Sequence, residues 1–403
     1  MRVLLTNPTG NQNSKNLGLA FLQSKKLEKY ITVFHINTNK IYFSFLPKIL
    51  KNELKKRDFS IFGTKVISSN PIREIIRIIV TKLKINKLIP YNFNPTETFK
   101  CLDKFSAKYI NSKITHVYNF QNCALQTFLK AKQEKIKCVY ELPTVYWKEH
   151  NNIIKNEIKK KPEFKEALLK TNFYVNVTKQ KLLDKELSLA DLIIVPSQYV
   201  KKTLKLYNGK FLKIKVIPYG FPKTCPINKK NWYDGKRKLK ILYAGSLNQN
   251  KGISYLVKTI NKLDLDKIEI EIIGSGPLEG HLKKNIKSAN FLGSISNEQI
   301  LRRMKNNDIF ISPTLFEGFG LTLSEAMSQG LVVMTTKNTF LGDLKKKNIF
   351  IKIDIKDIDK IVCNINRLIK KPSELKKIGQ TAIKYAQSNS WKKYRKRIIK
   401  EIN

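Results

Sequence analysis

Short runs of β-branched and other apolar residues alternate along this chain with longer segments of helical periodicity. The alternation is the pattern of parallel strands connected by helices, so the predicted fold class is α/β. The strands expected in the first half are Val3–Leu5, Thr32–Phe34, His116–Tyr118, Cys138–Tyr140, Leu192–Val195 and Lys215–Ile217. Those expected in the second half are Lys240–Tyr243, Ile268–Ile273, Ile309–Ile311 and Leu331–Met334.

A segment that is rich in turn-forming residues and poor in apolar periodicity, 221–237, separates the two halves. Each half begins with a strand followed by glycine, at Val3–Gly10 and again at Lys240–Gly245. Two such starts in 403 residues predict two Rossmann-like domains that face a central cleft. The expected parts are a first domain (1–220), a linker (221–237), a second domain (238–385) and a C-terminal helix (386–403) returning to the first domain.

An amphipathic helix is predicted over Pro71–Leu88, where apolar and basic residues occupy opposite faces. One interpretation is a surface helix over the sheet. The other is a helix that docks on an anionic membrane, supported by a basic helical pattern over Pro47–Phe59. The apolar positions are Ile72, Ile75, Ile76, Ile79 and Leu83, and the basic positions assigned to docking are Arg73, Arg77, Lys84 and Lys87.

The chain carries a formal net charge of +46, with lysine spread through every region. The charge reflects either a compositional bias towards lysine, isoleucine and asparagine or an attraction to polyanions such as nucleic acid, anionic lipid or acidic glycans. Five cysteines without a C-x-x-C pair favour a reducing compartment. Since no apolar run reaches about 18 residues and no signal-peptide pattern is present, we expect a cytoplasmic protein, soluble or peripheral at the inner membrane face.

The most informative segment, 309–336, reads as a buried strand, a glycine-bearing loop, a short helix and another buried strand. Gly318 and Gly320 let the backbone turn tightly and approach a ligand. The helix is expected from near Leu321 to near Gly330, and its first-turn amides suit a phosphate group.

Two glutamates flank the start of this helix, Glu317 in the loop and Glu325 about one turn inside. A carboxylate beside a phosphate site is favourable only if it accepts hydrogen bonds from hydroxyl groups. We therefore expect Glu317 to hold a transferred sugar and Glu325 to hold a ribose. A solvated surface pair is the alternative for two glutamates considered in isolation.

At this point the chain resembles the family-4 retaining glycosyltransferases of the GT-B fold. Their E-x7-E motif matches Glu317 to Val333, with Val332 where the family usually has proline. Further matching segments are Ala190–Ser197, Val216–Gly220, Gly245–Gly252, Ile272–Pro277, Phe291–Ile295, Ser390–Trp391 and, more weakly, Glu141–Pro143.

The resemblance implies that Lys251 contacts the diphosphate of the donor and that Lys251 and Glu317 are catalytic. Ser246 stands where many members have arginine, so it brings no charge. The main chain near Ile295 is expected to contact the base. The donor-binding set so implied is Gly245, Ser246, Lys251, Gly274, Ile295, Glu317, Gly318, Phe319, Gly320, Leu321, Thr322 and Glu325.

In the first domain the family often places a histidine over the donor sugar, after the strand expected at His116–Tyr118. His116 is the candidate, with Tyr118 or Asn119 as alternatives because His116 falls early in the strand. The acceptor-side candidates are Gly10, Asn119, Glu141 and His150, the last beside Glu149.

Two other patterns imitate known sites. Gly274–Gly280 imitates a dinucleotide fingerprint, but its third glycine falls one position late. Asp264–Asp266 imitates a D-x-D metal site, but it precedes its strand and reads as a turn. We expect no metal and no cofactor, because the resemblance implies a metal-independent reaction and no cysteine–histidine cluster has zinc spacing.

The sequence therefore predicts a retaining hexosyltransferase of cell-envelope polysaccharide biosynthesis. It would move a sugar from a nucleotide-diphosphate sugar to a glycan, lipid-linked or small-molecule acceptor. One alternative is a sugar-nucleotide epimerase of the same fold. Another is a basic nucleic-acid-binding protein, favoured by a pI near 10.0 but by no recognised nucleic-acid motif.

Overall fold

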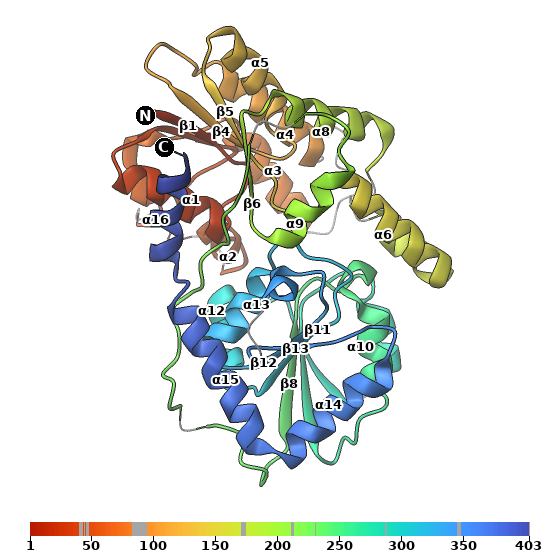
Figure 1. Cartoon of the computed structure of the whole chain (residues 1–403). Helices are drawn as coiled ribbons and strands as arrows, with labels where there is room; N and C mark the ends of the chain where they lie inside the picture. The colour runs from red at the N-terminus through yellow and green to blue at the C-terminus, as the bar shows by residue number, and fades with distance from the viewer. Residues whose placement is uncertain are drawn as a thin grey trace.

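The computed structural model describes the whole chain except residues 40–42, 44, 46–47, 83–94, 171–174, 211–212, 230, 287, 345–347 and 403. The described residues form two parallel sheets, one in each half, with helices packed on both faces (Figure 1). The predicted α/β class is confirmed. The proposed residue boundaries between the domains stay a prediction.

The first sheet has seven strands in the order β3-β2-β1-β4-β5-β6-β7. Neighbouring strands pair in parallel, and the direction of winding reverses between β1 and β4. Its strands are β1 (Val3–Thr6), β2 (Leu27–Thr32), β3 (Val66–Ser68), β4 (His116–Phe120), β5 (Lys137–Glu141), β6 (Leu192–Val195) and β7 (Ile214–Val216). Its helices are α1 (Gln12–Gln23), α2 (Lys48–Lys55), α3 (Pro71–Lys82), α4 (Pro95–Ala107), α5 (Leu125–Gln133), α6 (Trp147–Lys160), α7 (Lys165–Lys170), α8 (Val177–Leu189) and α9 (Gln198–Thr203), with 3₁₀ turns η2 (Ser60–Lys65), η5 (Pro162–Phe164) and η6 (Leu204–Leu206).

The second sheet has six strands in the order β10-β9-β8-β11-β12-β13, again all parallel, and reverses between β8 and β11. Its strands are β8 (Leu239–Ala244), β9 (Ile268–Ile273), β10 (Ala289–Gly293), β11 (Ile309–Ser312), β12 (Val332–Thr335) and β13 (Ile351–Lys352). The helices are α10 (Ile253–Ile260), α11 (Glu279–Asn285), α12 (Asn297–Lys305), α13 (Leu321–Ser328), α14 (Ile358–Lys370), α15 (Pro372–Gln387) and α16 (Trp391–Ile402), with 3₁₀ turns η7 (Gln249–Lys251) and η8 (Phe340–Asp343).

Strands β1, β6, β11 and β12 are buried along their whole length because helices cover both faces of the sheets, which explains their apolar sequences. The strand expected at Thr32–Phe34 is in fact β2, Leu27–Thr32. The pairing of Val3 with Leu27 starts β2 earlier, and Val33 and Phe34 are buried beyond its end. The short strands β3, β10 and β13 were not predicted.

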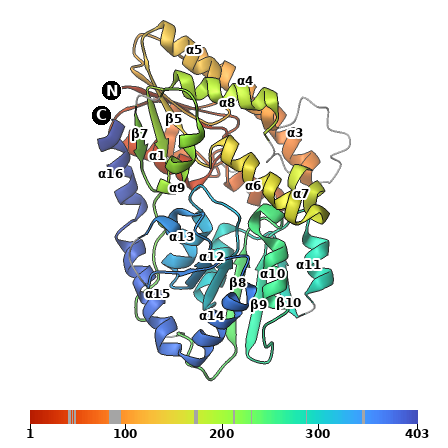
Figure 2. The same cartoon turned by 45° about the vertical axis from the view of Figure 1, so that its right-hand side comes forward.

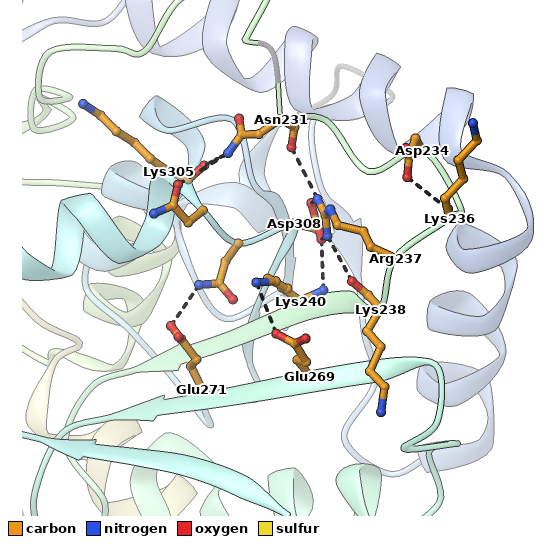
Figure 3. Close-up of polar contacts among 12 residues, drawn as sticks. Asn231, Asp234, Lys236, Arg237, Lys238, Lys240, Glu269, Glu271, Lys305 and Asp308 are labelled. Atoms are coloured by element: carbon orange, nitrogen blue, oxygen red, sulfur yellow. Dashed lines mark hydrogen bonds and ion pairs between the residues drawn. The ribbon is translucent and has the colours of Figure 1, made fainter.

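The linker packs tightly against the second domain (Figure 3). The guanidinium of Arg237 donates two hydrogen bonds to the buried carboxylate of Asp308, at 2.7 and 2.8 Å. The same carboxylate accepts a bond from the backbone amide of Lys240 at 2.9 Å, and Arg237 lies over the ring of Tyr233. Asp308 immediately precedes β11, so this anchor lies at the amino edge of the sheet.

The chain crosses between the two sheets at two neighbouring places, around Phe221 and around Ser390. The backbone amide of Phe221 donates to the carbonyl of Asn389 at 3.0 Å. After the second crossing α16 packs against α1, and the guanidinium of Arg395 donates to Asn16 at 2.6 Å (Figure 1). The chain therefore ends on the same sheet on which it begins.

Candidate functional site

The glycine-bearing loop and the η7 turn meet at the carboxyl edge of the second sheet, where its winding reverses. Loops at such a reversal point form the usual ligand crevice of an open α/β sheet. The loop after β8 leads into η7, and the loop after β11 leads into α13. The carbonyl of Asn250 accepts hydrogen bonds from the amide of Leu315 at 2.9 Å and from the hydroxyl of Thr314 at 3.2 Å. These bonds join the two loops.

Two of the three residues predicted to be catalytic, Lys251 and Glu317, lie together. The ammonium group of Lys251 forms an ion pair with the carboxylate of Glu317, and both side chains are partly buried. Lys251 ends the η7 turn, and the backbone amide of Glu317 donates to the carbonyl of Asn338 at 2.8 Å. The ion pair thus connects the two loops, and it gives each charged side chain a partner of opposite charge.

Helix α13 begins beside this pair, and in its first turn the amide of Leu323 already donates to the Gly320 carbonyl at 3.0 Å, which leaves the amides of Leu321 and Thr322 as the candidates for a ligand. Its N-cap residue, Gly320, has a φ of 85° and no side chain with which to cap the first turn. Leu321 and Thr322 follow and are partly exposed. The first turn of α13 therefore presents amide donors and the positive end of the helix dipole at the surface of the loop.

The backbone at Gly318 lies directly against the first domain. A Cβ atom at this position would lie 1.8 Å from the carbonyl oxygen of Pro143. The hydroxyl of Ser197, also in the first domain, donates to the Gly318 carbonyl at 2.7 Å. The absence of a side chain at Gly318 therefore allows the loop to dock against the opposite domain.

Glu325 is buried one turn into α13, with a residue exposure of 9%. The amide group of Asn297 at the start of α12 donates to its carboxylate at 2.7 Å. Burial raises the pKa of Glu325 to about 7, and this hydrogen bond opposes the rise. Our sequence reasoning missed Asn297, although the Ser296 and Gln299 capping box that starts α12 is visible in the sequence.

The remaining predicted donor residues lie on the loops after β8, β9 and β10. Gly274 approaches so closely that a Cβ atom would lie 1.8 Å from the Gly245 carbonyl oxygen. The hydroxyl of Ser246 lies 2.9 Å from the side-chain nitrogen of Asn248, which donates to it. Ile295 follows directly after Ser294, whose hydroxyl bonds to that of Ser275 at 2.8 Å. These loops lie at the same carboxyl edge as Lys251.

For Phe319, as for the rest of Gly318–Leu321, the resemblance implies contact with the donor through the main chain. The ring of Phe319 is buried, stacks on Phe340 at 4.2 Å between centroids and meets the edge of Tyr219 at 5.3 Å. The side chain belongs to the apolar core at the junction of the two halves. Only its main chain could meet a ligand.

The structure contradicts a catalytic role for His116. This residue starts β4, so it lies at the amino edge of the first sheet, opposite the carboxyl ends. Its Nδ1 bonds to the hydroxyl of Thr115 at 2.9 Å. Burial, followed by the nearby charge of Lys137, lowers the pKa of His116 to about 4. Both alternatives at this strand are fully buried: the hydroxyl of Tyr118 donates to Glu141 at 2.6 Å, and Asn119 donates to the carbonyl of Cys123 at 2.7 Å.

Glu141 is also misassigned as an acceptor-side group. Its carboxylate has no exposed surface and accepts hydrogen bonds from the hydroxyls of Tyr118, at 2.6 Å, and Tyr219. Burial raises the pKa of Glu141 to about 7, and these hydroxyls and Asn13 oppose the rise. Because Tyr219 touches Phe319, Glu141 instead supports the first-domain side of the junction from within.

Of the remaining acceptor-side candidates, His150 and Gly10, only His150 contacts the loop that carries Glu317. His150 is buried in α6, and its ring meets the edge of Phe316 at 5.1 Å, next to Glu317. Burial lowers the pKa of His150. Gly10, by contrast, allows close approach of the chain itself, since a Cβ atom there would lie 2.0 Å from the Lys56 carbonyl oxygen.

The orientation expected for the amphipathic helix is inverted. Arg77 and Arg57 turn inwards and bind the buried carboxylate of Glu74, with shortest contacts of 2.7 and 2.6 Å. The docking residue Arg73 is only partly exposed, and Lys84 and Lys87 lie outside the described residues. The residues that face solvent are Ile72, Ile75, Ile76 and Ile79, between 39% and 71% exposed.

Within the described part of the chain, no helix is long and apolar enough to cross a membrane. In the same residues, His, Cys, Asp and Glu side chains form no group of three or more that could hold a metal ion. Metal independence stays a prediction.

The second half of the chain is similar to known proteins. Residues 226–385 match the family described as Glycosyl transferases group 1. An uncharacterised glycosyltransferase of Methanocaldococcus jannaschii is 27% identical over 137 residues, 32% of this chain and 35% of that protein. The matched segments span only about a third of the length of this and similar curated relatives.

Solved structures resemble the whole chain. The sucrose-phosphate synthase of Thermosynechococcus elongatus covers 100% of this chain and 98% of its own at a TM-score of 0.68 and 15% identity. HepE of Anabaena in complex with UDP-glucose covers 100% and 99% at a TM-score of 0.62 and 16% identity. The chain therefore has the two-domain GT-B fold.

Proposed function

From a GT-B fold whose residues 226–385 match the glycosyl transferases group 1, we propose that this chain is a glycosyltransferase that uses a nucleotide-diphosphate sugar. The observation that carries the proposal is the convergence of Lys251, Glu317 and the first turn of α13 at one carboxyl edge. A cation and a row of amides beside two acids suit a ligand that carries both phosphates and hydroxyls.

The proposed reaction retains the configuration of the transferred sugar. The bond between the anomeric carbon and the diphosphate oxygen breaks, and a bond from that carbon to the acceptor oxygen forms on the same face. The acceptor proton passes to the departing diphosphate. Lys251 and the amino end of α13 stabilise the negative charge that develops there, while Glu317 holds the sugar ring and Glu325 the ribose. No metal takes part in the proposed reaction.

The ion pair between Lys251 and Glu317 must break when the donor binds. A bound diphosphate would replace Glu317 as the partner of Lys251, which frees the carboxylate for sugar hydroxyls. The two side chains are 23% and 21% exposed, so this exchange of partners takes place in a partly dehydrated site. Charged hydrogen bonds are stronger there than in water.

A UDP-sugar is the first donor to test, since HepE of Anabaena, which has the same fold, was solved with UDP-glucose. The acceptor is proposed to be a glycan, a lipid-linked sugar or a small molecule, reached from the first domain. His150 is the acceptor-side residue best supported by position, through its contact with Phe316.

We also propose that α3 places the enzyme on the inner face of an anionic membrane, by insertion of its isoleucines. Four isoleucines at helical spacing face solvent, whereas Arg77 is held by Glu74. In liposome flotation, Ile75→Asp combined with Ile76→Asp should reduce binding to vesicles of phosphatidylglycerol and phosphatidylcholine. Undiminished flotation of this variant would reject docking by the isoleucines.

The test of the function is a screen of donor hydrolysis across UDP-, GDP- and ADP-sugars, followed by transfer assays with the active donor. Lys251→Ala and Glu317→Ala should each lose most activity while keeping the thermal melting profile of the folded protein. Wild-type turnover in either variant would reject the site. Isomerised donor formed without any acceptor would instead favour an epimerase.

A further inference from the structure

A helical arm of the first half, formed by α6, η5 and α7, lies on the second domain. Figure 2 shows α6 and α7 above α10 and α11. Ile154, Phe164 and Leu168 of the arm are buried in the same apolar cluster as Leu256 of α10. The ring of Phe164 also meets the edge of His281 at 5.1 Å. The arm is therefore part of the contact between the two domains.

A buried carboxylate at the centre of this contact joins the arm to η7 and α10. Glu157 is 4% exposed. Its Oε1 accepts a hydrogen bond from the side-chain amide of Gln249 at 2.7 Å and from the hydroxyl of Tyr255 at 3.0 Å. Its Oε2 accepts from the same Tyr255 hydroxyl at 3.0 Å. Both donors are neutral residues of the second domain, so these hydrogen bonds hold the carboxylate across the junction.

Gln249 connects Glu157 to the donor-binding cation. Gln249 is the first residue of the η7 turn and Lys251 the last. The side-chain nitrogen of Gln249 also donates to the Ser254 hydroxyl at 2.7 Å, and its side-chain oxygen accepts from the Ser254 backbone amide at 3.1 Å. From its other side the turn is held through the Asn250 carbonyl by Leu315 and Thr314. The position of Lys251 is thus fixed between a first-domain carboxylate and the loop that carries Glu317.

We propose that Glu157 is a positioning residue that holds the η7 turn so that Lys251 faces the donor diphosphate. This inference rests on the proposed function. The hydrogen bond from Gln249 to Glu157 ties the turn to the arm. Without it the turn keeps its bonds to Ser254, Leu315 and Thr314 but loses its connection to the first domain, so Lys251 would be less well placed for the diphosphate.

The experiment measures the dissociation constants of UDP, GDP, ADP and uridine by titration calorimetry for wild type and variants. Glu157→Ala should weaken the best-bound nucleoside diphosphate by about tenfold or more, the effect of losing charged hydrogen bonds. Uridine affinity should stay unchanged, because the effect passes through Lys251. Glu157→Gln should recover most of the loss, since one amide oxygen in the place of Oε1 can accept from both donors. Glu163→Ala, an exposed arm residue, is the matched control.

The decisive measurement repeats Glu157→Ala in a Lys251→Ala background. If Glu157 acts through Lys251, its removal there should change diphosphate affinity by less than about twofold. The inference would be wrong if the two substitutions reduced diphosphate affinity independently, so that their fold-losses multiply in the double variant. It would also be wrong if Glu157→Ala weakened uridine binding equally. If Glu157→Ala does not fold, Gln249→Met breaks the same connection from the turn side and must show the same dependence on Lys251. Wild type that binds none of the three diphosphates would refute the proposed function itself.

Discussion

Replacing Glu325 by glutamine should stabilise the folded protein above pH 7 while it weakens binding of the donor. Burial raises the pKa of Glu325 from 4.5 to about 7, so the folded state holds a proton that the unfolded state has released. The stability from this proton is fully present below about pH 4.5 and is lost as the pH rises to about 7. At 1.36 kcal/mol for each pH unit, the loss is at most about 3 kcal/mol.

The assay is thermal unfolding of wild type and Glu325→Gln at pH 5 and pH 8. Glutamine mimics the protonated acid, so the two melting temperatures should differ little at pH 5. At pH 8 the variant should melt higher, by up to about 6–12 °C if the second domain unfolds as one unit. Nucleoside diphosphate binding should fall in the variant, because glutamine is a weaker acceptor for ribose hydroxyls.

Glu141→Gln is the matched control. The pKa of Glu141 is also raised to about 7 by burial, so its glutamine variant should gain stability at pH 8 in the same way. Glu141 lies in the first domain, where it is buried and hydrogen-bonded by Tyr118 and Tyr219. The Glu141→Gln protein should therefore bind nucleotide with the affinity of wild type. A pH-independent melting difference for Glu325→Gln, or undiminished nucleotide affinity, would refute the reasoning.

Three further predictions follow from the same contacts. Transfer activity should persist in excess EDTA, and a clear loss of rate would overturn metal independence. Asp308→Ala should destabilise the fold by about 1–3 kcal/mol in urea unfolding, because it leaves the Lys240 amide without its acceptor and the 35% exposed Arg237 without its partner, whereas Asp266→Ala at an exposed turn should change little. Gly318→Ala should lower kcat/KM strongly, since its Cβ atom would meet the Pro143 carbonyl, and wild-type kinetics would show that the loop need not dock.

The relative positions of the residues assigned to the donor could be predicted from sequence because they are local. One strand, two glycines and one short helix fix Glu317, Glu325 and the amides of α13 relative to each other within a few residues. Lys251 joins them because parallel strands bring their carboxyl ends to one edge. The pairing of Lys251 with Glu317 and the support of Glu325 by Asn297 depend on side-chain positions that spacing does not reveal.

The first-domain site was less predictable because the burial and the partners of each candidate residue depend on residues far away in the sequence. Glu141 is sealed by Tyr219, which lies 78 positions away. The isoleucines of α3 face outwards because Glu74, on the same helix, draws Arg57 and Arg77 to the inner face. The amphipathic pattern is the same for either orientation of the helix, so it could not distinguish them. Glu157 has no sequence signal, since its partners lie in the other domain. Ser197 ends a segment that resembles the family, but its hydrogen bond to Gly318 could not be read from that resemblance.

Amide hydrogen exchange would locate the bound diphosphate along the chain. We expect the nucleoside diphosphate selected by the donor screen to slow exchange in peptides spanning Glu317–Glu325 and Gly245–Gly252, and the matching nucleoside to slow it far less in both. Equal protection by nucleoside and diphosphate, or protection confined to other parts of the chain, would rule out phosphate binding by the amides at the start of α13.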